Sequence, residues 1–261
     1  IPEWVFKAFG LKPEKRNFNA DLTLFKDGFG VDHWEKGYHI PDITTQEMQM
    51  FVYYRACSFI DTGFEALHLG QVKLTGRNDP ENNVYTRLIG MIREYAKTHA
   101  RRGYVLINAH NNNFTSPDGK MLADMIVAPV RVHAAKDEVN HAVSEAEPQR
   151  CDIEPGYWGN SIYCSGISGT SPSGWYAEKY PYLVEFDNYG GIIGDTSDKD
   201  NCVWGKDEIT WYIMQPAWYR REFMNYLNNK IKGYNENGHM AFVGHRGGSF
   251  YSNNKSEQCP S

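Results

Sequence analysis

The sequence predicts an α/β fold built around a parallel β-sheet. Two short apolar runs, FEALHLGQV (residues 64–72) and YVLINAH (104–110), flank a helical pattern between them. A helix between two strands forms a crossover, so the two strands should be parallel neighbours. Both runs also end in polar residues, and chemistry in parallel sheets collects at the carboxyl ends of the strands.

The helical pattern between the two runs is well defined. Asp79 should cap its first amide groups, with Pro80 and Glu81 in the first turn. Gly103 should end the helix. The apolar positions that repeat at helical spacing, and so predict one buried stripe, are Val84, Leu88, Met91, Ile92 and Tyr95.

The other elements follow from the same signals. Thr44 and Glu47 form a predicted capping box at the start of a helix that Gly63 ends. Pro216 should start another helix. The predicted strands are a short one at residues 21–25, the run MIVAPVRVHA (125–134) with a bulge or edge at Pro129, YPYLVEFDNYGG (180–191) and MAFVGHRGG (240–248).

Length and charge narrow the class of protein. A chain of 261 residues suits a single barrel-sized domain, in which residues 1–43 would be an irregular covering segment and residues 136–180 a long loop region. The net charge of -5 does not favour binding to nucleic acid, which requires a positively charged surface. No apolar run approaches the roughly 20 residues that a membrane span requires. The sequence does not predict the oligomeric state.

The cysteines and the first residue of the sequence give information on the cellular compartment of the protein. Among the five cysteines, Cys57 falls in a helical pattern and should be a buried thiol, whereas Cys151 and Cys164 are close enough to close a loop. No cysteine or histidine spacing suggests a structural zinc site, and no cofactor motif is present. A chain that begins at Ile1 and carries glycosylation patterns at Asn113 and Asn254 is expected to be trimmed and secreted or periplasmic.

Alternation along the predicted strands sorts polar from apolar side chains. Successive strand residues point to opposite faces, so Leu67 and Leu69 suit the helix layer and His68 the other face. The residues that this rule places opposite their apolar neighbours are His68, Asn108, His110, Arg131, His133, Glu185 and Asp187. An unpaired charge in a dry core costs several kcal/mol, so a functional site explains the set better than a core.

Two carboxylates carry the predicted chemistry. Glu185 and Asp187 share a face of one strand at roughly 6 to 7 Å, a separation that suits acid/base and nucleophile work on a glycosidic bond. A second acid from a loop is an alternative, with candidates at Asp32, Glu154 and Asp207. The residues predicted to bind substrate are His68, Gln71, Asn108, His110, Arg131, Asn188, Trp204, Asp207, His245 and Arg246.

Structural explanations also exist for members of this set. His68 would serve equally as a hydrogen-bonded core imidazole. Arg131 would equally neutralise Glu185 or Asp187 as a buried pair. Asp207 also suits the first turn of a helix, where a carboxylate is favourable.

Residues 44–246 share two features with a known class of proteins. Their predicted strands end in polar residues, and their loops bear tryptophans; the strand ends are HLGQ, NAH, EFDNYG and GHR, and the tryptophans are Trp158, Trp175 and Trp204. The chain resembles (β/α)8-barrel (TIM-barrel) carbohydrate-active proteins of the glycoside hydrolase type. The resemblance implies hydrolysis of an oligosaccharide or polysaccharide without a cofactor, with an aromatic ring stacked on a sugar. Only about five strands are evident where a barrel needs eight, so either the barrel is incomplete or strands lie in residues 1–43 and 136–180.

Two other functions stay open. One is a carbohydrate-binding protein that keeps a barrel scaffold without catalysis. The other is a metal-dependent hydrolase in which His68, His110, His133 and Asp187 converge on a divalent ion.

Overall fold

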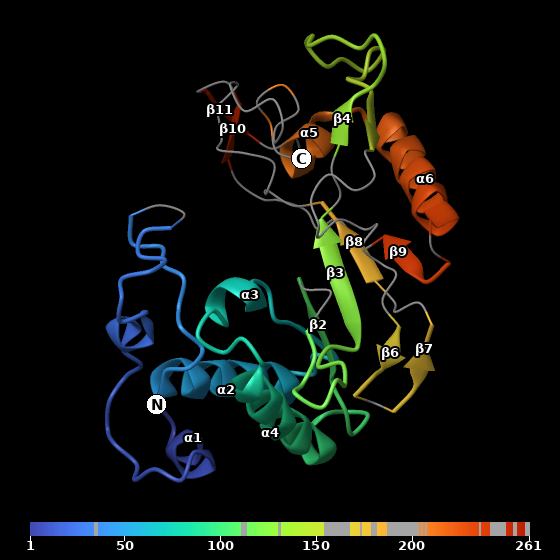
Figure 1. Ribbon diagram of the computed structural model, residues 1–261. Helices are drawn as coiled ribbons and strands as arrows, with labels where there is room; N and C mark the ends of the chain where they lie inside the picture. Colours follow the sequence, from blue (N-terminus) through green and yellow to red (C-terminus); the bar gives the residue numbers. More distant parts are fainter. Residues whose placement is uncertain are drawn as a thin grey trace. The chain divides into compact units, whose positions relative to one another are not determined.

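A computed structural model of the chain describes residues 1–33, 36–110, 114–129, 132–153, 168–172, 174–178, 182–186, 204, 206, 208–234, 236–240, 249–252 and 255–258. These residues form a mixed α/β fold around an open, five-stranded parallel sheet (Figure 1). Its strands, in spatial order, are β1 (Ala66–His68), β2 (Leu106–Ala109), β3 (Met125–Pro129), β8 (Tyr182–Glu185) and β9 (Gly238–Met240). The predicted α/β class with a parallel sheet is therefore confirmed, whereas the closed barrel stays a prediction.

The chain consists of two compact units, residues 1–125 with 169–177 and residues 126–168 with 178–261. Besides β1 and β2, the first unit contains α1 (Glu3–Ala8), η1 (Ala20–Thr23), α2 (Gln46–Asp61), α3 (Val72–Thr75), α4 (Asn83–His99), β6 (Gly169–Thr170) and β7 (Tyr176–Ala177). Besides β8 and β9, the second contains β4 (Val132–Ala134), β5 (Cys151–Ile153), α5 (Glu208–Met214), α6 (Ala217–Tyr234), β10 (Ser249–Ser252) and β11 (Lys255–Gln258).

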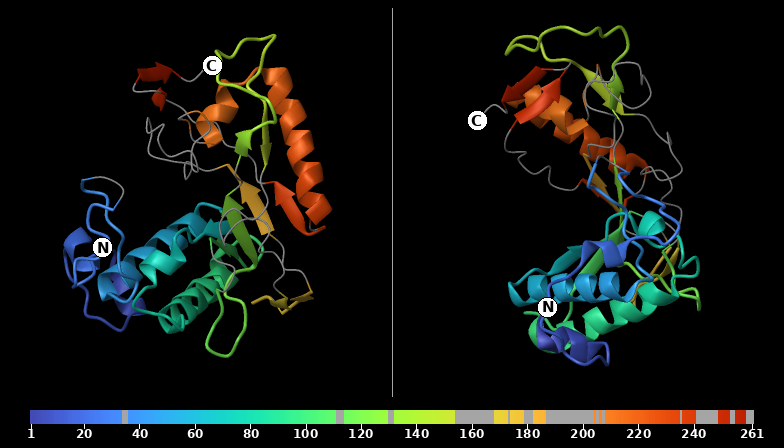
Figure 2. Two further views of the ribbon diagram at one scale, coloured as in Figure 1. Left: turned by 45° about the horizontal axis from the view of Figure 1, so that its top comes forward. Right: turned by 90° about the vertical axis from the view of Figure 1, so that its left-hand side faces the viewer.

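Helices α2 and α4 lie side by side and pack on one face of β1 and β2 (Figures 1 and 2). The strand side chains that meet them are apolar: Leu67 is 6% exposed, and Ile107 is fully buried. The other buried members of this core include Val105, Ala109, Ile60, Leu88, Ile89 and Ile92. The predicted alternation is therefore confirmed for β1 and β2, and it leaves the opposite face of these strands for polar residues.

Asp79 caps α4 as predicted, but the helix begins later than predicted. The Asp79 carboxylate accepts hydrogen bonds from the backbone N–H groups of Val84 (2.9 Å) and Tyr85 (3.2 Å). Asn82, at the N-cap position, has a left-handed backbone with φ of 56°, so the chain turns there before the helix starts. Placing Pro80 in the first helical turn was therefore wrong, because the side chain of Asp79 reaches across a complete turn.

The capping box at the start of α2 was wrong by one residue. The hydroxyl of Thr45, not Thr44, accepts a hydrogen bond from Met48 N–H at 3.2 Å. Glu47 turns away to form an ion pair with Arg16, whose two terminal nitrogens donate to its two oxygens at 2.8 Å each. The tertiary partner has displaced the local cap.

An ion pair that the sequence did not reveal joins α4 to the segment entering β3. Asp124 is 1% exposed, and its Oδ2 accepts from Arg93 at 2.8 Å and from Ile107 N–H at 2.8 Å. Asp124 N–H in turn donates to the carbonyl of Ile107 at 2.7 Å. Asp124 therefore binds the backbone in the middle of β2, and Arg93 connects it to α4.

The N-terminal segment is helical where a strand was expected. Residues 20–23 form the 3-10 helix η1, so the strand predicted at residues 21–25 is wrong apart from a single bridge between Leu24 and Pro41. Upstream, Val5 and Phe6 of α1 pack on Met50 of α2 as a small buried cluster. Asn19 explains the difference, because its side chain caps the short helix by accepting from Asp21 N–H.

In the second unit, the run MIVAPVRVHA forms two strands rather than one. β3 ends at Pro129, where proline can supply no ladder hydrogen bond, and β4 pairs antiparallel with β5 in a separate two-stranded sheet. Helix α6 packs along β9 (Figure 2). The rings of Trp211 and Phe223 meet edge to face at 4.9 Å in the buried interior beneath α5 and α6.

Candidate functional site at the ends of β1 and β2

Two histidines and an asparagine meet at the carboxyl ends of β1 and β2. His68 and Asn108 are register partners in the parallel ladder, and both lie on the face opposite α2 and α4. His68 Nδ1 lies 2.5 Å from Asn108 Oδ1, which is a hydrogen bond between the two side chains. The ring of His110 meets the ring of His68 edge to face, with 4.6 Å between the centroids. The structure thus brings together three of the predicted site residues.

The backbone after β1 is tied to the backbone of β2. Leu69 N–H donates to the carbonyl of Asn108 at 2.9 Å. The carbonyl of Gly70 accepts from His110 N–H at 3.3 Å and from Val72 N–H at 2.9 Å. Gln71 then stands at the N-cap position of α3 with its side chain exposed. The strand ends are therefore held in place by main-chain hydrogen bonds, and the side chains of the site project from a fixed backbone.

The side chains of this cluster are suited to hydrogen bonding. His68 is exposed, and Asn108 and His110 are half-buried, so the group faces outward rather than into the core. Imidazole and carboxamide groups offer both donors and acceptors without a fixed charge. Such groups can bind the hydroxyls of a neutral ligand.

Glu185 ends β8 in the second unit. Its neighbours Val184 and Phe186 are buried at 0% and 6% exposure, whereas Glu185 is half-buried on the other face. The alternation predicted for this strand is confirmed as far as Phe186. The second predicted carboxylate, Asp187, lies outside the described residues.

Several other predicted site residues also lie outside the described residues. They are Arg131, Glu154, Trp158, Asn188, Asp207, His245 and Arg246. Trp204 is described: it is half-buried and has a left-handed backbone with φ of 52°. Asp32 is described as well, and its carboxylate accepts from Gly37 N–H within an exposed loop.

His133 does not belong to the parallel sheet. It lies on β4, whose partner is the antiparallel strand β5, and its Nδ1 lies 3.1 Å from the carbonyl of Ala134. His133 therefore does not lie at a strand end of the parallel sheet, where it was expected to meet His68 and His110. Within the described part of the chain, no group of three or more histidine, cysteine or acidic side chains is arranged to hold a metal ion.

Trp175 is exposed on the turn of the β6–β7 hairpin, where the carbonyl of Trp175 accepts from Ser171 N–H. The carbonyl of Thr170 in this hairpin accepts from Met121 N–H at 3.3 Å. The hairpin is a separate two-stranded sheet. Trp175 therefore stands on this hairpin and not at the end of one of the five parallel strands, where sugar stacking was expected.

Two cysteines can be assessed as nucleophiles. Cys57 and Cys151 are free and buried thiols. Burial raises the pKa of Cys57 to about 12 and raises that of Cys151 as well. Neither is therefore an activated nucleophile. The expectation of a buried thiol at Cys57 is confirmed. Cys151 is a free thiol, and Cys164, with which it was expected to close a loop, lies outside the described residues.

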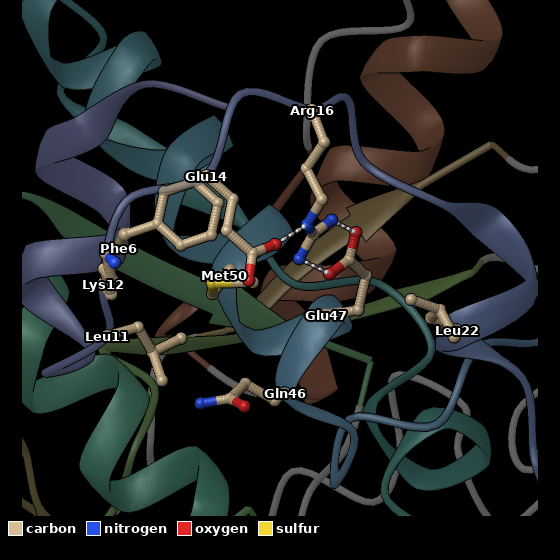
Figure 3. A pocket seen from close by; sticks show the side chains of 9 residues that line it. All are labelled: Phe6, Leu11, Lys12, Glu14, Arg16, Leu22, Gln46, Glu47 and Met50. Carbon is tan, nitrogen blue, oxygen red and sulfur yellow. Dashed lines mark hydrogen bonds and ion pairs between the residues drawn. The ribbon is translucent and has the colours of Figure 1, made fainter.

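A cavity of about 350 Å³ lies in the first unit between the N-terminal segment and the start of α2 (Figure 3). The side chains that line it are Phe6, Leu11, Lys12, Glu14, Arg16, Leu22, Gln46, Glu47 and Met50. The guanidinium of Arg16 is directed at Glu47 and Glu14, and the bonds to Glu47 lower the pKa of that carboxyl. Because its nitrogens are engaged by these carboxylates, Arg16 offers little to an anionic ligand.

Comparison with known proteins gives no match: no protein-family model, curated protein or solved structure matches this chain. None of the helices in the described ranges is both long and apolar enough to cross a membrane.

Proposed function

We propose that this chain is a glycoside hydrolase that acts on an oligosaccharide or polysaccharide. The observation that carries the proposal is the outward-facing group of His68, Asn108 and His110 at the ends of two parallel strands. These side chains are hydrogen-bonded to one another or packed together, yet they remain accessible. A rigid set of neutral donors and acceptors is what recognition of sugar hydroxyls requires.

The acid and the nucleophile of this proposal are Glu185 and Asp187. Both follow from the sequence pattern at the end of β8, and Glu185 lies opposite the buried side chains of that strand. Paired carboxylates protonate the leaving oxygen and either attack the sugar or activate water. A separation of about 5.5 Å between them favours retention of configuration, and more than about 6.5 Å favours inversion.

A (β/α)8 barrel is the finer form of the fold that we propose. The five strands follow one another in space in the same order as in the sequence. In a barrel each strand is added beside the preceding one, whereas doubly wound sheets reverse direction at a switch point. The uninterrupted order therefore supports a singly wound arrangement.

The test is hydrolysis of a glycan panel by the purified full chain. Release of reducing sugar from at least one neutral polysaccharide is expected, and it should fall by at least about a hundredfold in Glu185→Gln or Asp187→Asn. Glu236→Gln is the matched control, because it makes the same change at an exposed position between α6 and β9. Full activity in both carboxylate variants would contradict the proposed mechanism, and binding without turnover would indicate a carbohydrate-binding protein.

A further inference from the structure

The geometry points to His68 Nε2 as a hydrogen-bond acceptor for a sugar hydroxyl, with Asn108 setting the tautomer of the ring and Gly70 keeping the approach to Nε2 open. This inference deepens the proposed function, on which it rests for the nature of the ligand. It assigns a specificity-determining role to Gly70, a residue with no side chain of its own.

The tautomer follows from the bond between His68 and Asn108. A carboxamide oxygen can only accept, so the hydrogen in the 2.5 Å contact must be on His68 Nδ1. A neutral imidazole carries one N–H, and therefore Nε2 bears a lone pair. In free histidine the other tautomer prevails, in which Nε2 carries the hydrogen. Asn108 is thus a positioning residue that converts His68 from a donor into an acceptor at Nε2.

The ring is also held in orientation. Asn108 holds one edge of the His68 ring at Nδ1. The His110 ring packs edge to face against it, with 4.6 Å between the ring centroids and 65° between the ring planes. A rotation of His68 about its side-chain bonds would lose both interactions. The direction of the Nε2 lone pair is consequently set before any ligand arrives, which lowers the entropy lost on binding.

Gly70 stands beside this acceptor. A Cβ atom built at Gly70 would lie 3.7 Å from His68 Nε2 and 4.0 Å from its Cδ2; apart from the chain neighbours of Gly70, no other atom of the described residues lies within 4 Å. These are ordinary van der Waals distances, so alanine fits without a clash, but its methyl group would cover Nε2. The two hydrogen bonds to the Gly70 carbonyl prevent the backbone from moving aside. Glycine therefore preserves the space through which a hydroxyl reaches the nitrogen.

The ligand class follows from the lone pair. An acceptor on a neutral ring binds a neutral hydroxyl donor and has no attraction for a carboxylate or sulfate at the same place. We therefore expect a free hydroxyl of a neutral sugar at this position. A sugar whose hydroxyl is replaced by hydrogen or by a methyl ether would lose the bond.

The tautomer can be measured without any ligand. In the full chain labelled with ¹⁵N-histidine, long-range ¹H–¹⁵N spectra at pH 8 distinguish the two ring nitrogens. We expect His68 to carry its hydrogen on Nδ1, and Asn108→Ala to restore the Nε2–H form in a protein that remains folded. An Nε2–H tautomer in the wild-type chain would overturn the inference, whether or not the protein hydrolyses glycans.

Binding tests the role of Gly70. Cellohexaose, xylohexaose, mannohexaose and maltohexaose are titrated into the wild-type chain, and we expect one of them to shift the His68 Nε2 resonance. Gly70→Ala should weaken that affinity about tenfold, as expected for the loss of one hydrogen bond. Gly90→Ala is the matched control, because Gly90 is exposed on α4 and, outside its own stretch of helix, no described residue has an atom within 4 Å of a Cβ built there.

The outcomes separate this inference from the proposed hydrolysis. The Nδ1–H tautomer with a Gly70-dependent affinity, but no turnover, supports the acceptor and contradicts only the hydrolase. Turnover that is unchanged in Gly70→Ala, with no shift of the Nε2 resonance, supports a hydrolase and overturns the acceptor. A panel in which none of the four sugars binds would also overturn the assigned ligand class.

Discussion

Replacing Glu47 tests what holds the N-terminal segment on α2. The Glu47 side chain is 4% exposed and accepts two hydrogen bonds from Arg16 and one from Asn19 N–H, each at 2.8 Å. Removing one partner of a buried pair costs about 3 to 5 kcal/mol. Arg16 is 31% exposed and keeps its bond to Glu14, so its charge stays partly hydrated. For Glu47→Gln we expect a loss of about 2 kcal/mol of unfolding free energy.

Urea denaturation of the wild-type chain and of Glu47→Gln measures this loss of unfolding free energy. Glu3→Gln provides the control, because Glu3 forms an exposed pair with Lys7 at 3.3 Å on α1 and should lose less than about 0.5 kcal/mol. The unfolding free energy measured at acidic pH provides a second test. Hydrogen bonds from Arg16 lower the pKa of the Glu47 carboxyl below its ordinary value of 4.5. The stabilisation is therefore present above about pH 4.5 and disappears as the pH falls through the lowered pKa.

The wild-type chain should consequently approach Glu47→Gln in stability in strong acid. Equal stability of Glu47→Gln and Glu3→Gln at pH 7 would mean that the buried pair contributes no more than a surface pair, contrary to this prediction. A difference that grows as the pH falls would contradict the assigned sign.

Three further predictions concern the core and the caps of the first unit. Asp79→Ala should lose about 1 to 2 kcal/mol in urea denaturation, because the first amides of α4 lose their acceptor, and Asp79→Asn should lose less. Ile107→Ala should lose about 3 kcal/mol by leaving a cavity between β2 and the helices, and a loss under 1 kcal/mol would contradict its full burial. Cys57 should react with 5,5′-dithiobis(2-nitrobenzoate) at pH 8 only on unfolding, because burial raises its pKa to about 12; rapid labelling of native Cys57 would contradict this.

Local patterns predicted the parts of the fold that local physics determines. The alternation of Leu67 and His68, or of Ile107 and Asn108, records which face of each strand is buried, so it placed both polar residues on the correct face. The stripe on α4 was only partly right. Leu88 and Ile92 are buried as predicted, but the other buried positions are Tyr85, Ile89 and Ala96.

Errors arose where a distant partner outweighs a local preference. Glu47 has the spacing of a capping box, but Arg16, 31 residues away, offers a charged bidentate bond instead. Asp124 gave no local signal, because its partner Arg93 lies on another element. Composition also predicted one strand over 125–134, since only tertiary pairing shows that β4 joins β5. A helix such as α4 or a strand such as β1 was predictable, whereas these connections were not.

The site was predictable to the same extent. Parity and parallel pairing brought His68 and Asn108 together on the sequence alone, because neighbouring parallel strands end at one edge. The role of Gly70 could not be predicted from the sequence. It depends on the position of this residue beside the His68 ring, which a Cβ atom would cover.

A crystal structure of the full chain with a bound neutral oligosaccharide would show whether His68 accepts a hydrogen bond from a sugar hydroxyl. We expect a sugar hydroxyl within hydrogen-bond distance of His68 Nε2, at the ends of β1 and β2, with the Asn108 contact retained. A sugar bound only in the cavity beside Phe6 and Met50, with the His68 ring solvated, would contradict it.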